Sequence, residues 1–190
     1  FVLSRAQYEA GRKAEISEAN LHFIAEAGKA LASSLDYRRT IQAVAQMGIL
    51  TISDWCSVDI KRDGLIEQIA LAHKDPEQVK WAKRYRKMNL PALKDKTGLA
   101  KILRTGKPEV YPLITKEMLQ QSAKDDEELK IIEQLRIHSV MMVPLRLHMK
   151  TIGVMSYIST DPKRSYDESD VAVAEEIAHR AALAIEHARL

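Results

Sequence analysis

Two apolar runs joined by a tight turn and followed by a long alanine-rich helix constrain the fold of this chain more than any other feature. The runs are Ser139-Val-Met-Met-Val-Pro-Leu-Arg-Leu-His148 and Ile152-Gly-Val-Met-Ser-Tyr-Ile158, and only Met149-Lys150-Thr151 separates them. Strands joined by so short a connection pair antiparallel. A loop ending at Ser165-Tyr166-Asp167 then leads into a helix predicted over residues 168–190, whose small side chains permit close packing on another helix.

A second hairpin is predicted earlier in the chain. From Asp54 to Lys61 apolar and polar residues alternate, as on a strand with one buried face. Asp63-Gly64 is a two-residue turn signal, and residues 65–73 are the returning strand. A short strand is expected over residues 109–112, near an edge because of its flanking prolines. Together these strands predict one antiparallel sheet.

Helices are predicted between the strands. Asp36 is expected to cap a helix over residues 37–52, and Pro76 lies in the first turn of a helix that runs to about Met88. Residues 98–104 are expected to form a short helix, and residues 115–136 one highly charged helix with a solvated outer face. No internal repeat or flexible linker interrupts this order, so the 190 residues suit one domain with an extension.

Residues 3–35 are predicted to form one long helix, since they lack proline and are rich in Ala, Glu, Lys and Leu. An interrupted heptad runs along this helix, with seven of its ten core positions apolar. The d positions are Leu3, Ala10, Ser17, Ile24 and Leu31, and the a positions are Gln7, Ala14, Leu21, Gly28 and Leu35. Two interpretations remain open: an amphipathic helix packed on its own domain, or the seam of a homodimer.

Composition excludes several classes of function. The net charge of +3 is mild and the basic residues are scattered, apart from short clusters such as Lys80–Lys87, so no nucleic-acid partner is expected. No apolar run approaches the roughly 20 residues of a membrane-spanning segment. The single cysteine, Cys56, excludes an internal disulfide and is typical of a reducing compartment, which predicts a cytoplasmic location. Because the chain starts at Phe1, we expect it to be a piece of a longer protein.

As a set, the motifs resemble a GAF domain, a small sensory module of signalling proteins. The resemblance rests on Pro144-Leu145, Ile152-Gly153-Val154, Tyr166-Asp167-x-x-Asp170 with the alanine-rich helix after it, and Asp54 before the first strand. It implies an α+β, GAF-like and PAS-related fold with a central antiparallel sheet of about five to six strands, helices on both faces and long terminal helices packed together. It also implies an N-terminal helical extension at residues 1–20 and a GAF domain at residues 21–190.

The resemblance places a ligand site between one sheet face and the helices that cross it. The positions that match pocket residues of the family are Ser57, His73, Leu99, Ala100, Tyr111 and Ser156. Leu99 and Ala100 begin a helix, where unpaired backbone N–H groups attract an anion or a carbonyl group. The structural alternatives are that Ser57 only faces helices, that His73 caps the next helix, and that Tyr111 belongs to the core.

No cofactor, metal ligand or catalytic group is identified. The six histidines lack metal-ligand spacing, and no phosphate-binding loop or nucleophile motif is present. Ser159-Thr160-Asp161 replaces part of the Asn-Lys-Phe-Asp-Glu set of cyclic-nucleotide-binding relatives, and Cys56 lacks the following His of bilin-binding relatives. Sulfoxide reductases of this family use several cysteines, and one cannot complete their cycle. Phosphotransfer by His179 and haem ligation by His73 are disfavoured, so an enzyme is not expected.

The sequence therefore predicts a sensory or regulatory domain of a bacterial signalling protein. It would bind an unidentified small ligand, form a homodimer through its N- and C-terminal helices, and relay the signal to an output domain outside this fragment. The alternative is a ligand-free structural or dimerisation domain, in which Met141, Met142 and Met155 fill the space with core.

Overall fold

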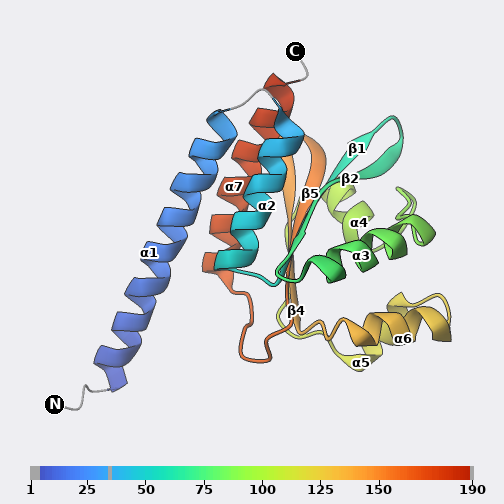
Figure 1. Cartoon of the computed structure of the whole chain (residues 1–190), viewed down its shortest axis with the longest axis horizontal. Helices are drawn as coiled ribbons and strands as arrows, with labels where there is room; N and C mark the ends of the chain where they lie inside the picture. The colour runs from blue at the N-terminus through green and yellow to red at the C-terminus, as the bar shows by residue number, and fades with distance from the viewer. Residues whose placement is uncertain (1–4, 34–35, 189–190) are drawn as a thin grey trace.

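A five-stranded antiparallel sheet forms the middle layer of the protein, with helices on both sides of it (Figure 1). The computed structural model describes residues 5–33 and 36–188, apart from the side chain of Met88. The strand order is β2-β1-β5-β4-β3, and neighbouring strands are antiparallel. The strands are β1 (Trp55–Arg62), β2 (Leu65–His73), β3 (Glu109–Tyr111), β4 (Ser139–Leu147) and β5 (Lys150–Ser159). The α+β class and the antiparallel sheet expected from the sequence are confirmed.

The helices α1, α2 and α7 lie together on one side of the sheet, and α3, α4, α5 and α6 lie on the other (Figure 1). The helices are α1 (Arg5–Ala32), α2 (Tyr37–Thr51), α3 (Pro76–Met88), α4 (Gly98–Thr105), α5 (Lys116–Ser122), α6 (Asp126–Gln134) and α7 (Glu168–His187). Because α1 contacts α7, the packing of the long terminal helices against each other is confirmed. Among the residues that the structure describes, no helix has both the length and the apolar character needed to cross a membrane.

Both predicted hairpins are present, and left-handed backbone makes their turns. Asp63 and Gly64, with φ of 50° and 80°, join β1 to β2 as a type I′ turn requires. His148 has a φ of 53° at the end of β4, and β5 begins at Lys150. The second turn therefore lies slightly earlier, and the second strand starts earlier, than the sequence predicted.

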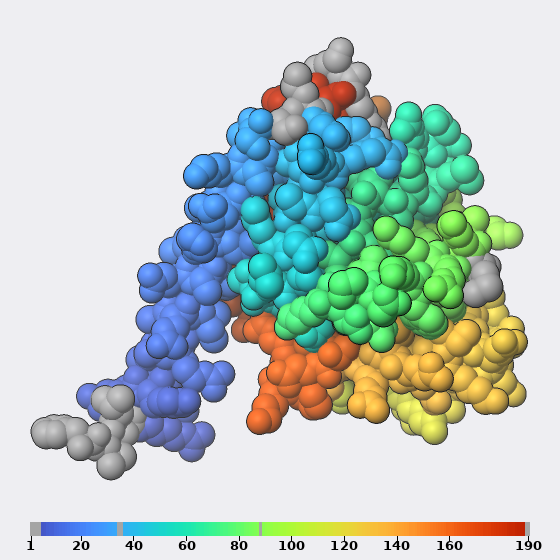
Figure 2. Space-filling model, in the orientation of Figure 1, coloured from blue at the N-terminus to red at the C-terminus, as the bar shows by residue number. Residues whose placement is uncertain are grey.

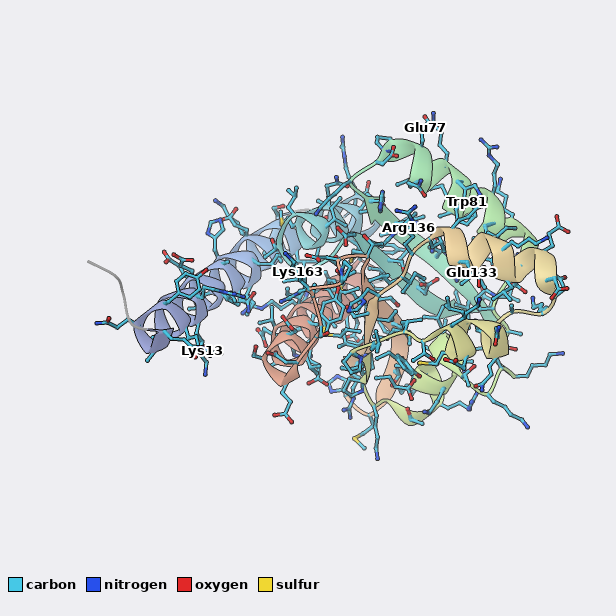
Figure 3. The ribbon with its side chains drawn as sticks, turned by 90° about the horizontal axis from the view of Figure 1, so that it is seen from below. Lys13, Glu77, Trp81, Glu133, Arg136 and Lys163 are labelled. Atoms are coloured by element: carbon cyan, nitrogen blue, oxygen red, sulfur yellow. The ribbon has the colours of Figure 1, made fainter. Side chains whose placement is uncertain are left out.

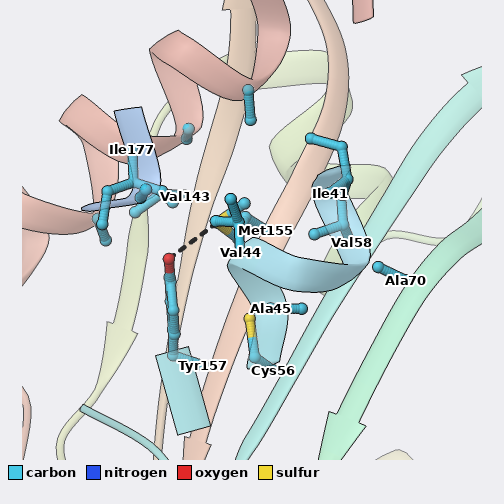
Figure 4. Packing of buried hydrophobic residues seen from close by; sticks show 14 of the residues in the cluster. Ile41, Val44, Ala45, Cys56, Val58, Ala70, Val143, Met155, Tyr157 and Ile177 are labelled. Atoms are coloured by element: carbon cyan, nitrogen blue, oxygen red, sulfur yellow. Dashed lines mark hydrogen bonds between the residues drawn. The ribbon is translucent and has the colours of Figure 1, made fainter. Parts of the chain in front are cut away.

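The main hydrophobic core lies between the sheet and the helices α1, α2 and α7 (Figure 4). Alternate residues of β1 enter it, and Cys56, Val58 and Ile60 are completely buried there. The same alternation on β5 buries Met155 and Tyr157, whose hydroxyl donates a hydrogen bond to the Met155 sulfur at 2.8 Å. The residues between them on β1 and β5 therefore face the other side of the sheet.

Only the second half of α1 packs on the domain. Its buried residues are Asn20, Phe23, Ala27 and Leu31, whereas residues 5–19 are exposed throughout. The first half extends away from the body of the protein (Figures 1 and 2). Among the heptad positions, Leu31 belongs to the domain core and Leu21 is 66 % exposed, while Leu3 and Leu35 lie outside the described residues. The packed-helix interpretation therefore holds for the second half, and the first half is left without an intramolecular surface to cover.

The prediction of a single helix over residues 115–136 is wrong, because two helices occupy this segment. Helix α5 ends at Ala123, whose backbone is extended, and α6 begins after Asp125. The Asp125 carboxylate accepts a hydrogen bond from the Glu128 N–H at 2.8 Å. This cap satisfies a backbone donor that would otherwise need a preceding helical turn, so a new helix starts here.

A close approach between β1 and β5 gives a test of the packing. A Cβ atom at position 153 would lie 2.5 Å from the Asp59 carbonyl oxygen, which is backbone and cannot swing aside. Gly153→Ala is therefore expected to lower the free energy of unfolding by about 1–3 kcal/mol, as overpacking does. The control is Gly11→Ala on the exposed half of α1, where alanine has open space and should stabilise by up to about 1 kcal/mol. Urea denaturation measures both variants, and equal stabilities would contradict this packing.

Candidate functional site

A cavity of about 330 Å³ lies between the sheet and α3, on the side opposite the main core. Residues of β1, β2 and β5 form its floor, and its walls come from α3, the segment after α3, and α6 with its flanking residues. The aromatic and polar side chains that line it are Trp55, Ser57, Gln68, Trp81, Tyr85, Arg86, Asn89, Asp95, Lys124 and Glu128. Cavities that hold small molecules have volumes of roughly 300–1,000 Å³, so this one is large enough for a small ligand.

Helix α3 forms the wall opposite the sheet. Its first turn is set by Asp75, whose carboxylate accepts a hydrogen bond from the Glu77 N–H at 2.9 Å, and by Pro76, which needs no donor there. Trp81 and Tyr85 lie one turn apart with stacked rings, 5.6 Å between centroids and 9° between planes. This pair places two aromatic side chains along the cavity wall.

A hydrogen bond joins α3 to α6 beside the cavity. The Tyr85 hydroxyl donates to the Glu128 carboxylate at 2.5 Å, and the other Glu128 oxygen accepts from the Lys124 N–H at 2.8 Å. Figure 3 shows the two helices side by side, with Trp81 on α3 and Glu133 on α6. Burial and the Glu128 carboxylate raise the pKa of Tyr85, so its hydroxyl remains a donor at neutral pH.

A buried ion pair connects α3 to the middle of the sheet. Asp59 of β1 is only 1 % exposed, and its carboxylate pairs with the guanidinium of Arg86 on α3. The Ser57 hydroxyl donates to the same carboxylate at 3.4 Å. Burial raises the pKa of Asp59 to about 6, and this effect outweighs the opposite pull of Arg86 and Ser57.

The structure brings one of the six predicted residues into the cavity lining. Ser57 lies there, and Ser156 is its ladder partner on β5 but is not part of the lining. The His73 ring packs on Trp55, with 4.0 Å between centroids, and its Nδ1 accepts from the Asp75 N–H at 2.9 Å. His73 therefore packs against the lining residue Trp55 and contacts Asp75, the N-cap residue of α3.

The other three predicted residues lie around α4 and β3, outside this lining. Ala100 is buried in the first turn of α4, beside the partly buried Leu99. The Tyr111 hydroxyl donates to Glu109 at 2.7 Å, and Glu109 also pairs with Lys101 of α4. Burial and the Glu109 carboxylate raise the pKa of Tyr111 to about 12. These contacts connect the edge strand β3 to α4 and form a polar cluster that is separate from the cavity.

The lining residues of α3 were missed from the sequence. Trp81, Tyr85 and Arg86 lie within the basic cluster Lys80–Lys87, which was interpreted only as charge. The spacing of four between Trp81 and Tyr85 was the available signal, since it places both rings on one face of a helix. The partner of Arg86 could not be found in this way, because Asp59 lies 27 residues earlier.

Cys56 lies on the core side of β1 and is completely buried. Burial raises the pKa of its thiol, because an apolar environment disfavours the thiolate. Among the described residues, no group of three or more His, Cys, Asp or Glu side chains is arranged to hold a metal ion.

The family model of the GAF domain matches residues 38–185, and the chain belongs to this family. No curated protein sequence matches the chain.

Solved GAF-fold structures resemble the chain over most of its length. The GAF domain of a phosphoenolpyruvate-protein phosphotransferase from Coxiella burnetii has a TM-score of 0.69 and 17% identity, covering 90% of this chain and 95% of that one. The A. aeolicus nlh2 GAF domain in an inactive state has a TM-score of 0.63 and 11% identity, with 90% and 98% covered. Free methionine-R-sulfoxide reductase from Neisseria meningitidis, in complex with its substrate, has a TM-score of 0.66 and 14% identity, with 90% and 92% covered. At these identities the likeness is one of fold alone.

The burial of Cys56 predicts a thiol that does not react in the folded protein. Ellman's reagent should leave the native chain unlabelled over hours and label one thiol per chain in concentrated guanidinium chloride. The physical reason is that both the thiolate and the reagent are excluded from the core. Rapid stoichiometric labelling of the native protein would contradict this burial and would mean that Cys56 is accessible for reaction.

Proposed function

We propose that this GAF domain is a sensory or regulatory module that binds a small ligand in the cavity under α3. The observation that carries the proposal is the cavity itself, which has β1, β2 and β5 as its floor and α3, the segment after α3, and α6 with its flanking residues as its walls. Its chemistry suits a small ligand with an apolar or planar body and a few hydrogen-bonding groups. Trp55, Trp81 and Tyr85 offer apolar surface, while Ser57, Gln68 and Asn89 offer donors and acceptors.

A second observation separates this proposal from the ligand-free alternative. In that alternative the methionines fill the space that a ligand would take. Met141 and Met155 are completely buried, but they belong to the core with α2 and α7 on the opposite side of the sheet. Met142 pairs with Ser156 and so lies on the same face as Ser57, but it is not part of the cavity lining. They leave the cavity under α3 open, which favours a ligand there.

The route of the signal runs through β1, because its two faces contact different layers. Ser57 and Asp59 face the cavity side, and Val58 between them packs in the core with α2. Helix α2 contacts both α1 and α7. A ligand that binds one arrangement of β1 more tightly than another would therefore bias the terminal helices, and through them an output domain outside residues 1–190.

A homodimer through α1 is part of the proposal. Residues 5–19 form a helix whose side chains are all exposed in the part of the chain that the structure describes. Tyr8 and Ile16 in this stretch are 59 % and 43 % exposed, and Leu21 just after it is 66 % exposed. Isolated helices of about 12–15 residues are marginal in water, so a partner surface would stabilise this segment. A second copy of the chain offers a matching surface.

Catalysis is not proposed. The Neisseria meningitidis reductase establishes that the fold can hold a reductase site. Cys56 is the single cysteine of this chain, and it lies in the core rather than in the cavity. A thiol without a second cysteine cannot complete a disulfide-forming cycle.

Filling the cavity tests the ligand proposal. Ala82 lies on α3 in the cavity lining, and Ala82→Phe should occupy the space and abolish binding. Ala43→Phe is the matched control, because Ala43 is an exposed residue of α2, and this variant should bind as the unaltered protein does. Native mass spectrometry beside the denatured mass measures the occupancy. A non-covalent mass that persists in Ala82→Phe would place the site elsewhere, and no mass on any variant would favour the ligand-free alternative.

A charge on the exposed face of α1 tests the dimer. Leu21→Glu places a carboxylate in the expected seam and should raise the dimer dissociation constant by about tenfold or more. Leu50→Glu is the control, because Leu50 is a leucine of similar exposure, 76 %, on α2 rather than on α1. Analytical ultracentrifugation reports the change. A dimer that tolerates Leu21→Glu would place the seam elsewhere.

A further inference from the structure

Helix α3 is attached to the domain by few contacts. Among its side chains that the structure describes, none is fully buried, and its outer face carries Lys80, Lys83, Arg84 and Lys87, all exposed. The polar contacts that hold it over the cavity are the Tyr85–Glu128 hydrogen bond to α6 and the Arg86–Asp59 ion pair to β1. The second of these is its polar link to the sheet.

The two partners of that ion pair differ in their access to water. Asp59 is almost completely buried, whereas the Arg86 side chain is 22% exposed and also lines the cavity. An arginine in this position can turn its charge into water when the pair breaks, because its stem is long and flexible. A buried carboxylate has no such route, so it must take up a proton instead.

We infer that α3 is a movable cover of the cavity, and that the Arg86–Asp59 pair is the latch that holds this cover on the sheet. The inference rests on the proposed function in one respect: the cavity under the cover is the ligand site. Opening of the cover would give a ligand its way in, and β1 would register the opening because Asp59 is one of its central residues.

The surroundings of Asp59 make the latch sensitive to pH. The groups that face its carboxylate are the Arg86 guanidinium from α3 and the Ser57 hydroxyl from β1. Its ladder partners are Gln68 on β2 and Val154 on β5, and neither side chain ionises. Above about pH 6, the raised pKa of Asp59, the carboxylate is charged and holds Arg86. Below it the carboxyl group is neutral, so Arg86 loses its charged partner and the latch weakens, with Asp59 staying shielded from water on β1 as α3 shifts.

Loosening of the latch differs from unfolding in the sign of its pH dependence. Because the pKa of Asp59 is higher in the folded protein than its ordinary 3.8, the folded state binds this proton more readily than the unfolded state. Between about pH 6 and pH 4 the contribution of Asp59 to global stability therefore rises as the pH falls. The cover is thus expected to open in a domain that stays folded.

Tryptophan fluorescence tests the latch, since both tryptophans of the chain, Trp55 and Trp81, line the cavity. Trp55→Phe leaves Trp81 on α3 as the single reporter. In this background, acrylamide should quench Trp81 about two- to threefold faster in Asp59→Asn and in Arg86→Gln than in the parent. Arg84→Gln is the matched control, because Arg84 is an exposed cation of the same helix with no ion pair among the described residues.

The pH profile gives a second readout. Quenching of the parent should rise as the pH falls, with a midpoint near 6, and should be high and flat in Asp59→Asn. A pH response that remains in that variant would come from a group other than Asp59 and would count against the latch. Hydrogen exchange should speed up in α3 amides and not in those of β5.

Three results would overturn the inference. The first is equal acrylamide quenching of Trp81 in the parent and in both latch variants. The second is an increase in quenching in Arg84→Gln as large as that in the latch variants. The third is a loss of cooperative unfolding in the latch variants, which would mean that the ion pair is needed for the fold as a whole. The measurements need no ligand. A cavity that binds nothing would therefore remove the proposed ligand site and leave the result on α3 standing, whereas a bound ligand with unchanged quenching would overturn the latch alone.

Discussion

The register of β1 decides where the charges and the apolar groups of this domain lie. The strand pairs with β2 on one side and β5 on the other, so that Ser57 lies opposite Leu71 and Ser156. A slip by one residue would turn Asp59 into the hydrophobic core and bring Ile60 out of it. Gly153 on β5 supports this register, because its missing side chain leaves room for the Asp59 backbone. The core on one side and the cavity on the other both depend on this pairing.

Asp59 lowers the stability of such a strand, because its charged carboxylate is removed from water when the sheet forms. Burial raises its pKa even with Arg86 beside it, so the pair does not fully offset the loss of water. An apolar side chain at this position would be easier to bury, and packing alone therefore does not explain a carboxylate here. Its partner belongs to α3, the helix that walls the cavity. The charge is better explained by the position it imposes on α3 than by the stability of the sheet.

Local signals made much of the fold predictable, and long-range contacts made most of the site unpredictable. The Asp63-Gly64 turn, the Asp36 cap, Pro76 in the first turn of α3 and the alternation along β1 each depend on a few neighbouring residues. The break between α5 and α6 was missed because the Asp125 cap competes with a charged sequence that also suits a continuous helix. Arg86 sits among cations that face water, and the pattern of charge cannot tell which of them turns inward to meet Asp59.

The contact between α1 and α7 explains how a small change at the sheet could become a large one elsewhere. The nearest atoms to a Cβ atom at Gly28 would belong to the Arg180 side chain of α7, so the two helices lie side by side here. Gly28 was placed in the predicted dimer seam, yet its close neighbour belongs to the same chain. The packed half of α1 is therefore tied to α7, while the other half projects from the domain. Since α1 has 28 residues, it spans about 42 Å, and a slight rotation of its packed half would move its exposed end by a larger distance.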